Sequence, residues 1–239
     1  MAKGKLYLIP SLLGEYDPSE VIPPQVLERL KEIRKYVVEE ARTARRYLSA
    51  AGLKGHVAEL EFHELNEHTE PAEVEALLSM FSDPDGSPTD VGLVSEAGLP
   101  AVADPGARLV ALCHDHGIKV VPMVGPSSLM LALMGSGLNG QSFAFCGYLP
   151  AKADERRKAI REIERRSSQL NQTEIFIETP YRNDSMMADL LAALQPETRL
   201  CVAADITLPD ETILTKSVRH WRRTPFTIGK RPCVFLILA

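Results

Sequence analysis

The sequence predicts an α/β protein with two domains. At about 100–200 residues per domain, its 239 residues allow one large domain or two small ones. Short apolar runs alternate with segments of helical spacing up to residue 124, which indicates a parallel α/β first domain. In the second half, the last three apolar runs follow one another without long helices between them. This favours antiparallel pairing and a mixed sheet.

The first domain is expected to span residues 1–124. Strands are expected where apolar residues run together, and helices where they recur every three or four positions. The expected strands are Lys5–Pro10, Tyr36–Val38, Val57–Phe62, Val91–Ser95 and Lys119–Met123. The expected helices begin behind Pro23-Pro24 and then cover Glu40–Ala51, Pro71–Phe81 and Gly106–His116. The two prolines suit a first helical turn, and Gly52 suits a helix end.

The second domain is expected to span residues 125–239. Its expected helices are Ser127–Met134, Ala153–Arg166 and Asp184–Leu194. Its expected strands are Phe143–Tyr148, Glu174–Glu178, Leu200–Ile206, Thr212–Thr215 and Cys233–Leu238. The order of these elements predicts a sheet with both parallel and antiparallel neighbours.

Composition excludes several classes of protein. Apolar residues make up 45% and charged residues 25%, which is ordinary for a globular chain and argues against disorder. No apolar run approaches the roughly 18–20 residues that cross a bilayer, and the apolar part of the N-terminus is too short for a signal peptide. The four cysteines form no C-x-x-C pair, which suggests reduced thiols and a cytoplasmic location.

The formal net charge of −5 is unevenly distributed. Residues 55–107 carry twelve acids and neither Lys nor Arg. After Glu211 there is no acid, and the bases are Lys216, Arg219, Arg222, Arg223, Lys230 and Arg231. This distribution excludes a globally basic nucleic-acid coat but leaves room for a local basic face.

Three loops are candidates for ligand binding. The segment Val94–Gly106 follows an expected strand and precedes an expected helix, so it lies at the carboxyl edge of a parallel sheet, where ligands bind. Its two glycines and two prolines favour a ligand loop over an ordinary connection. The loops Pro10–Gly14 and Val124–Ser128 could face the same ligand, although Gly125-Pro-Ser-Ser128 is far more often a capped helix start than a binding site.

In this order, the segments resemble the tetrapyrrole methylase superfamily of S-adenosylmethionine-dependent methyltransferases. Within it they are most similar to the ribosomal RNA small subunit methyltransferase I branch, which methylates a cytidine 2′-hydroxyl in 16S RNA. The matching segments are Leu6–Pro10 with Gly14, Glu39–Arg42, Val94–Gly106, Val120–Pro126, Phe143–Lys152, Phe176–Arg182, Ala203–Thr207 and Glu211-Thr212.

The resemblance implies a two-domain fold with S-adenosylmethionine in the cleft between the domains. It also implies a ribosomal RNA or small-subunit partner and a homodimer, with no metal and no membrane association. The donor contacts that it implies are Pro10, Gly14, Ser95, Glu96, Ala97, Gly98, Asp104, Pro105, Ser127, Ser128, Leu149, Ala203 and Ala204.

The acceptor side of the reaction is less defined. A ribose hydroxyl gains from a nearby base, and the candidates are Glu39, Glu40, Glu67, His68 and Glu178. Glu40 with Arg42 is the pair placed at the cleft edge; the alternative for Glu40 is a charge that complements a helix N-terminus. Glu178 with Arg182 is interpreted as a structural ion pair. The chain departs from the branch at Ala41, Ala204 and Arg231-Pro232. Another acceptor, such as a small molecule or another RNA, and a non-catalytic donor-binding protein therefore remain open.

Overall fold

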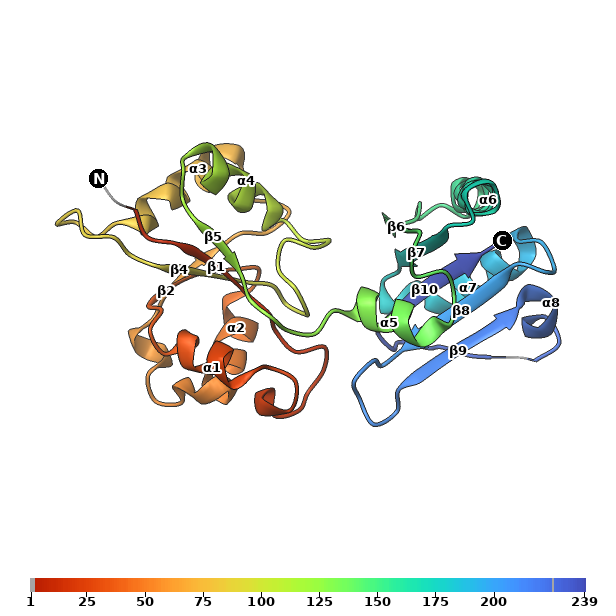
Figure 1. Cartoon of the computed structure of the whole chain (residues 1–239), viewed down its shortest axis with the longest axis horizontal. Coiled ribbons are helices and arrows are strands. Elements are labelled where there is room, and N and C mark those ends of the chain that lie inside the picture. The colour runs from red at the N-terminus through yellow and green to blue at the C-terminus, as the bar shows by residue number, and fades with distance from the viewer. Residues whose placement is uncertain (1–2, 225) are drawn as a thin grey trace. The chain divides into compact units, whose positions relative to one another are not determined.

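The computed structural model describes residues 3–224 and 226–239, so Met1 and Ala2 of the expected first domain and Pro225 of the second lie outside the described residues. The chain divides into two compact units, and the boundary between them falls between Ser127 and Ser128. Each unit is built around one five-stranded sheet (Figure 1). The predicted α/β class is confirmed.

The sheet of the first unit is entirely parallel. Its strands are β1 (Leu6–Ile9), β2 (Lys35–Val38), β3 (Glu61–Glu64), β4 (Val91–Val94) and β5 (Val120–Pro122). They are arranged in the order β3-β2-β4-β1-β5. Ile9 and Val38 both pair with Val94, so the last residues of β1, β2 and β4 lie level with one another.

Two helical layers cover the first sheet (Figure 1). The α-helices are α1 (Pro24–Leu30), α2 (Ala41–Leu48), α3 (Pro71–Ala76) and α4 (Ala107–Asp115). Alternate side chains of each strand point to opposite faces, so Tyr36 packs with residues of α1 and α2 while Val37 packs with residues of α3 and α4. Shorter helical turns occupy Pro18–Glu20, Ser49–Leu53, Val57–Glu59 and Leu77–Phe81.

Three sequence predictions in this unit need correction. The strand expected at Val57–Phe62 lies later, at Glu61–Glu64, and Val57–Glu59 is a 3₁₀ turn. This strand is at the sheet edge, where half its surface is open, so its apolar alternation is weak. The helix from Pro71 tightens to 3₁₀ at Leu77. The helix from Ala41 ends at Leu48 and passes into a π turn around Gly52, whose φ of 103° favours glycine.

The sheet of the second unit is mixed. Its strands are β6 (Phe143–Tyr148), β7 (Thr173–Ile177), β8 (Arg199–Ala204), β9 (Thr212–Ser217) and β10 (Cys233–Leu238), in the order β6-β7-β10-β8-β9. Only β6 and β7 are parallel among these neighbours. Strand β10 runs antiparallel to both β7 and β8, and β9 runs antiparallel to β8. The ends of β6, β7 and β8 and the starts of β9 and β10 therefore lie on the same side of the sheet, here called its edge.

Helices α6 (Ala153–Leu170), α7 (Asn183–Ala193) and α8 (Val218–Trp221) pack on one face of this sheet, around Phe176, Phe235 and Trp221. Helix α5 (Ser128–Ser136) packs against β9 and β10. Pro180–Arg182 forms a 3₁₀ turn, here called η5. Within residues 3–224 and 226–239, no helix combines the length and apolar character that crossing a membrane requires.

A buried charge cluster joins α6 to α7. The Asp189 carboxylate accepts hydrogen bonds from Arg156 Nε at 2.7 Å and from Arg157 Nε at 2.6 Å. Arg156 and Asp189 are each 4% exposed, so neither charge has water to solvate it. Breaking a buried pair of this kind leaves an uncompensated charge in the interior.

We expect Asp189→Ala to lower the free energy of unfolding by about 3–5 kcal/mol, because the buried Arg156 loses its charged partner and keeps only its bond to the Ala151 carbonyl. Urea denaturation followed by circular dichroism measures this. The control is Glu162→Ala, which removes the exposed Glu162–Arg165 pair on α6, the helix of Arg156, and is expected to change stability little. Equal effects of the two substitutions would contradict the assignment.

Candidate functional site

The loops after β1, β2 and β4 leave the first sheet at one level. The residues that follow the aligned strand ends are Pro10, Glu39 and Ser95. The backbone N–H of Ser11 donates to the carbonyl of Gly98 at 2.8 Å and so ties the β1 loop to the long loop after β4. The hydroxyl of Tyr47 on α2 donates to the carbonyl of Pro10 at 2.7 Å. These bonds fix the first loop from both sides.

The long loop from Ser95 to Gly106 has an unusual backbone. Gly98, Ala101 and Ala103 all have positive φ, at 73°, 65° and 61°. The Asp104 carboxylate closes the turn by accepting from the N–H groups of Ala101 at 2.8 Å and of Gly106 at 2.7 Å. Two of these residues are alanines, which reach this region only at an energetic cost, so the surrounding bonds determine the conformation.

The third predicted loop touches the other two. A Cβ atom on Gly125 would lie 2.2 Å from Cβ of Pro10, and one on Gly98 would lie 3.6 Å from the carbonyl oxygen of Pro126. The backbone at Gly125 therefore approaches Pro10 more closely than a side chain permits, whereas Gly98 and Pro126 are at ordinary contact distance. The three loops that the sequence indicates are brought together at one edge of the sheet.

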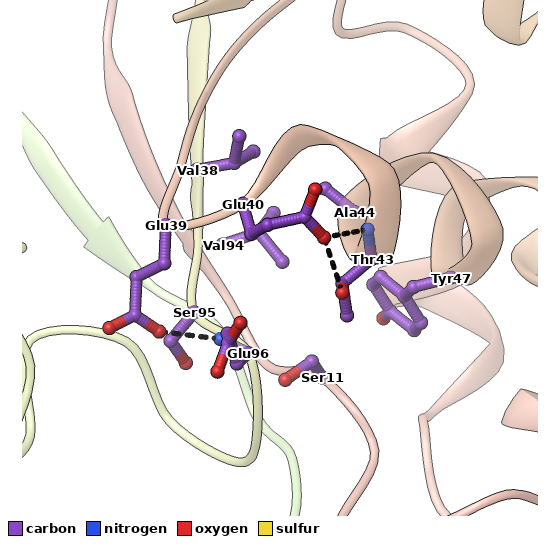
Figure 2. A pocket seen from close by; sticks show the side chains of 10 residues that line it. All are labelled: Ser11, Val38, Glu39, Glu40, Thr43, Ala44, Tyr47, Val94, Ser95 and Glu96. Atoms are coloured by element: carbon purple, nitrogen blue, oxygen red, sulfur yellow. Dashed lines mark hydrogen bonds between the residues drawn. The ribbon is translucent and has the colours of Figure 1, made fainter. Parts of the chain in front are cut away.

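A small pocket opens at this edge (Figure 2). Its lining combines backbone loops with hydroxyl and carboxylate groups: Ser11, Val38, Glu39, Glu40, Thr43, Ala44, Tyr47, Val94, Ser95 and Glu96. The Ser11 hydroxyl is buried and has no hydrogen-bond partner among the described residues. Buried polar atoms are normally paired, so this unsatisfied hydroxyl suits a site that binds a polar ligand.

Glu39 and Glu40 differ sharply in environment (Figure 2). Burial raises the pKa of Glu39, and the nearby Asp104 and Glu96 carboxylates raise it further. The backbone N–H of Glu96, which donates to the Glu39 carboxylate at 2.7 Å, lowers the pKa and so opposes the shift. A carboxyl group with a raised pKa beside a candidate ligand loop is typical of functional sites. Burial also raises the pKa of Asp104, although the N–H groups of Gly106 and Ala101 oppose the shift.

Glu40 is the N-cap of α2. Its carboxylate accepts from the Thr43 hydroxyl at 2.6 Å and from the N–H groups of Arg42 at 2.7 Å and Thr43 at 2.6 Å. These bonds, the hydroxyl first, lower the pKa of Glu40. The geometry therefore favours the helix-capping alternative. The catalytic role of Glu40 with the exposed Arg42 stays a prediction.

The second unit holds the other predicted donor contacts. Leu149 directly follows β6 and is 6% exposed, and Ala203 and Ala204 are fully buried at the end of β8. Ser128 is the first residue of α5. Leu149 and the two alanines lie at the edge of the second sheet where β6 and β8 end. Their contact with a donor stays a prediction.

The sequence did not single out Ser11 or Tyr47. Ser11 lies inside the predicted loop Pro10–Gly14, so the sequence indicated its segment but not the residue itself. Tyr47 carries no local signal, because its hydroxyl reaches a carbonyl 37 positions earlier in the chain. Among the described residues, no three His, Cys, Asp or Glu side chains are grouped so that they could hold a metal ion.

Comparison with known proteins identifies the family of this chain. Residues 19–220 match the family model of the Tetrapyrrole (Corrin/Porphyrin) Methylases. The chain belongs to the tetrapyrrole methylase family. Its members are S-adenosylmethionine-dependent methyltransferases, and the predicted resemblance is confirmed.

Relatives with assigned names sharpen the likeness. The ribosomal RNA small subunit methyltransferase I of Neisseria meningitidis serogroup B is 34% identical over 215 residues, which cover 90% of this chain and 68% of that protein. The protein of the same name from Pseudomonas aeruginosa is 30% identical and covers 99% of this chain, with 79% of its own length matched.

Solved structures agree on the fold at lower identity. The methyltransferase CobJ has a TM-score of 0.63 at 17% identity, with 98% of this chain and 94% of that one covered. Uroporphyrin-III C-methyl transferase from Thermus thermophilus, complexed with S-adenyl homocysteine, has a TM-score of 0.59 at 18% identity, with 98% and 97% covered. Both likenesses support the tetrapyrrole methylase fold of this chain.

The first prediction for this site concerns Gly98. We expect Gly98→Ala to weaken S-adenosylmethionine binding at least tenfold in calorimetry, because φ is 73° and the new Cβ would meet Leu13 at 3.2 Å. The matched control is Gly117→Ala, at a φ of 65° with open space around it. Both changes cost about 1–2 kcal/mol of stability. Equal donor affinity in the two variants would contradict the predicted role of the loop.

The second prediction concerns the pH dependence of Glu40. Its folded-state pKa lies below the ordinary 4.5, so its carboxylate stabilises the fold above that pH and loses this effect as the pH falls through the lowered value. We expect Glu40→Ala to lower the thermal midpoint by a few degrees at pH 7, and the difference to shrink in acid.

The control is Glu75→Ala, which removes an exposed glutamate inside α3 and leaves no cap empty. Methyl transfer by Glu40→Gln separates the two interpretations of this residue. A cap predicts nearly normal turnover, whereas a general base predicts a loss of about 10²–10⁴-fold.

Proposed function

We propose that this chain transfers a methyl group from S-adenosylmethionine to the 2′-hydroxyl of a cytidine in 16S ribosomal RNA. The observation that carries the proposal is the identity of 30–34% to ribosomal RNA small subunit methyltransferases I over 87–99% of the chain. The three meeting loops of the first unit supply a place for the donor.

The donor residues we propose are those that the resemblance implies. Methyl transfer is an in-line displacement in which the acceptor oxygen attacks the methyl carbon while the carbon–sulfur bond breaks, leaving S-adenosylhomocysteine and a proton. Alignment alone can contribute about 7–11 kcal/mol to such a step. Loops of Gly, Pro, Ser and Ala, held by backbone bonds such as Ser11–Gly98, suit this task because they place amides and carbonyls without bulky side chains.

The departures at the acceptor side have a structural counterpart. Arg231 donates through Nε to Asp205 at 2.5 Å, and through Nη2 to the Asp210 carbonyl at 2.7 Å and to the Thr212 hydroxyl at 2.9 Å. The loop after β8 is thereby tied to the segment before β10 by charge. Arg231, one of the departures from the branch, therefore has a defined structural role at this edge of the second sheet.

Two bases of the basic C-terminal stretch also have partners within the second unit. Arg222 donates to the carbonyls of Leu191 at 2.8 Å and Leu194 at 2.9 Å, so it closes the end of α7. Arg219 pairs with Glu197. Both guanidinium groups keep their positive charge, so the whole stretch stays a candidate for phosphate contacts.

The tetrapyrrole methylase fold also suits a different acceptor, such as a small molecule or another RNA. A non-catalytic donor-binding protein is the third alternative. A homodimer and a cytoplasmic location, which the resemblance and the cysteine pattern imply, stay predictions.

The decisive test uses small ribosomal subunits from a deletion strain that lacks the 16S ribose methyl group. We expect the purified protein to transfer label from S-adenosylmethionine to these subunits, and mapping to place the label on a cytidine 2′-hydroxyl. Subunits that already carry the methyl group are the control. Donor binding without transfer to any RNA would favour the non-catalytic alternative, and label at another position would sink the proposed acceptor.

A further inference from the structure

Exposed tyrosines and bases gather at the edge of the second sheet where β6 and β7 end. Tyr148 is the last residue of β6 and is 56% exposed, and Tyr181 lies in the η5 turn just after β7 and is 71% exposed. The pairing of Tyr148 with Ile177 places these two strand ends side by side (Figure 1). Exposed aromatic rings that occur at neighbouring strand ends, together with bases, suggest a binding surface.

Arg182 lies against the Tyr181 ring, with the guanidinium carbon 5.5 Å from the ring centroid. Its Nε and Nη2 donate to one oxygen of Glu178 at 2.9 and 2.6 Å. The Glu178 side chain is fully buried, whereas that of Arg182 is 25% exposed. The guanidinium is therefore anchored on its inner side and presents its outer edge to water beside the ring.

The anchor itself is costly. The second carboxylate oxygen of Glu178 is buried and has no hydrogen-bond partner among the described residues. A buried ion pair is weak evidence for stability, and an unsatisfied charged oxygen makes it weaker. The predicted structural ion pair exists, but its geometry is that of a support for Arg182 at the surface.

A further base is placed beside this turn by Asn183. Its amide nitrogen donates to the carbonyls of Gly229 at 3.1 Å and Arg231 at 2.7 Å, which holds the exposed Lys230 between them. The Tyr181 surface, defined as Tyr148, Tyr181, Arg182 and Lys230, thus combines two aromatic rings with two positive charges on one sheet edge.

We propose that the Tyr181 surface binds a single-stranded segment of the RNA acceptor. The Tyr181 ring stacks on an unpaired base, and the outer edge of Arg182 donates to a neighbouring phosphate. Aromatic rings interleaved with bases are the pattern of single-strand binding, because every base offers a face for stacking and every phosphate a charge. Duplex RNA hides its base faces, so it satisfies only half of this surface. The inference rests on the proposed function.

The test measures binding of a fluorescent single-stranded RNA of about 12 nucleotides to the full chain. We expect Tyr181→Ala to weaken binding about tenfold or more, and Tyr181→Phe to bind like the wild type because the ring is retained. Phe143→Ala is the matched control, since Phe143 is 41% exposed at the start of β6, at the other end of the strand from Tyr148. It is expected to leave RNA binding unchanged.

The phosphate contact is tested through salt. Arg182→Gln alone would strand the buried Glu178 carboxylate, so the variant is Glu178→Gln with Arg182→Gln, and its folding is checked by thermal melting. We expect the slope of log binding constant against log salt to decrease by about 0.7, as for one phosphate contact on a single strand. Donor affinity, measured by calorimetry, should be unchanged in every variant.

Three outcomes would overturn the inference: equal RNA binding by Tyr181→Ala and wild type, equal losses in Tyr181→Ala and Phe143→Ala, or a preference for the same RNA in a duplex. Failure of the proposed function is distinguishable from these. If the chain binds single strands through Tyr181 but methylates no ribosomal subunit, the Tyr181 surface stands and the proposed acceptor is wrong. If the Tyr181→Ala variant binds RNA and methylates subunits like the wild type, the proposed function stands and the inference is wrong.

Discussion

The level alignment of Ile9, Val38 and Val94 is the constraint on which the first unit depends. A parallel sheet sends its strands out at one edge, and equal register makes the chains leave at equal height. Pro10, Glu39 and Ser95 therefore begin their loops as neighbours although they are far apart in sequence. A register shift of one residue in β4 would turn its side chains to the opposite face and separate the loops.

The two units arrange their functional edges by different means. In the first, backbone bonds, close-packed glycines and a few side chains such as Tyr47 and Asp104 hold the loops. In the second, charged pairs such as Glu178–Arg182 and Asp205–Arg231 hold turns at the strand ends.

The sequence predicted most of the fold because the buried strands Leu6–Ile9 and Val91–Val94 are continuous apolar runs between turn residues. It misplaced β3, whose edge position leaves no strong apolar pattern. The three candidate loops were predictable from their Gly and Pro content. The helix N-terminus was already the alternative for Glu40, because its capping bonds are local. The Tyr47–Pro10 bond and the unpaired Ser11 hydroxyl were not predictable, since each depends on how segments far apart in the chain meet.

The position of Arg222 at the end of α7 affects how evolution in this family should be interpreted. Its guanidinium satisfies carbonyls that would otherwise lack partners, so selection for folding alone can preserve a base there. A basic residue retained at this position across relatives would therefore not by itself indicate nucleic-acid binding. Tyr181, whose ring covers no core, has no such second reason to persist.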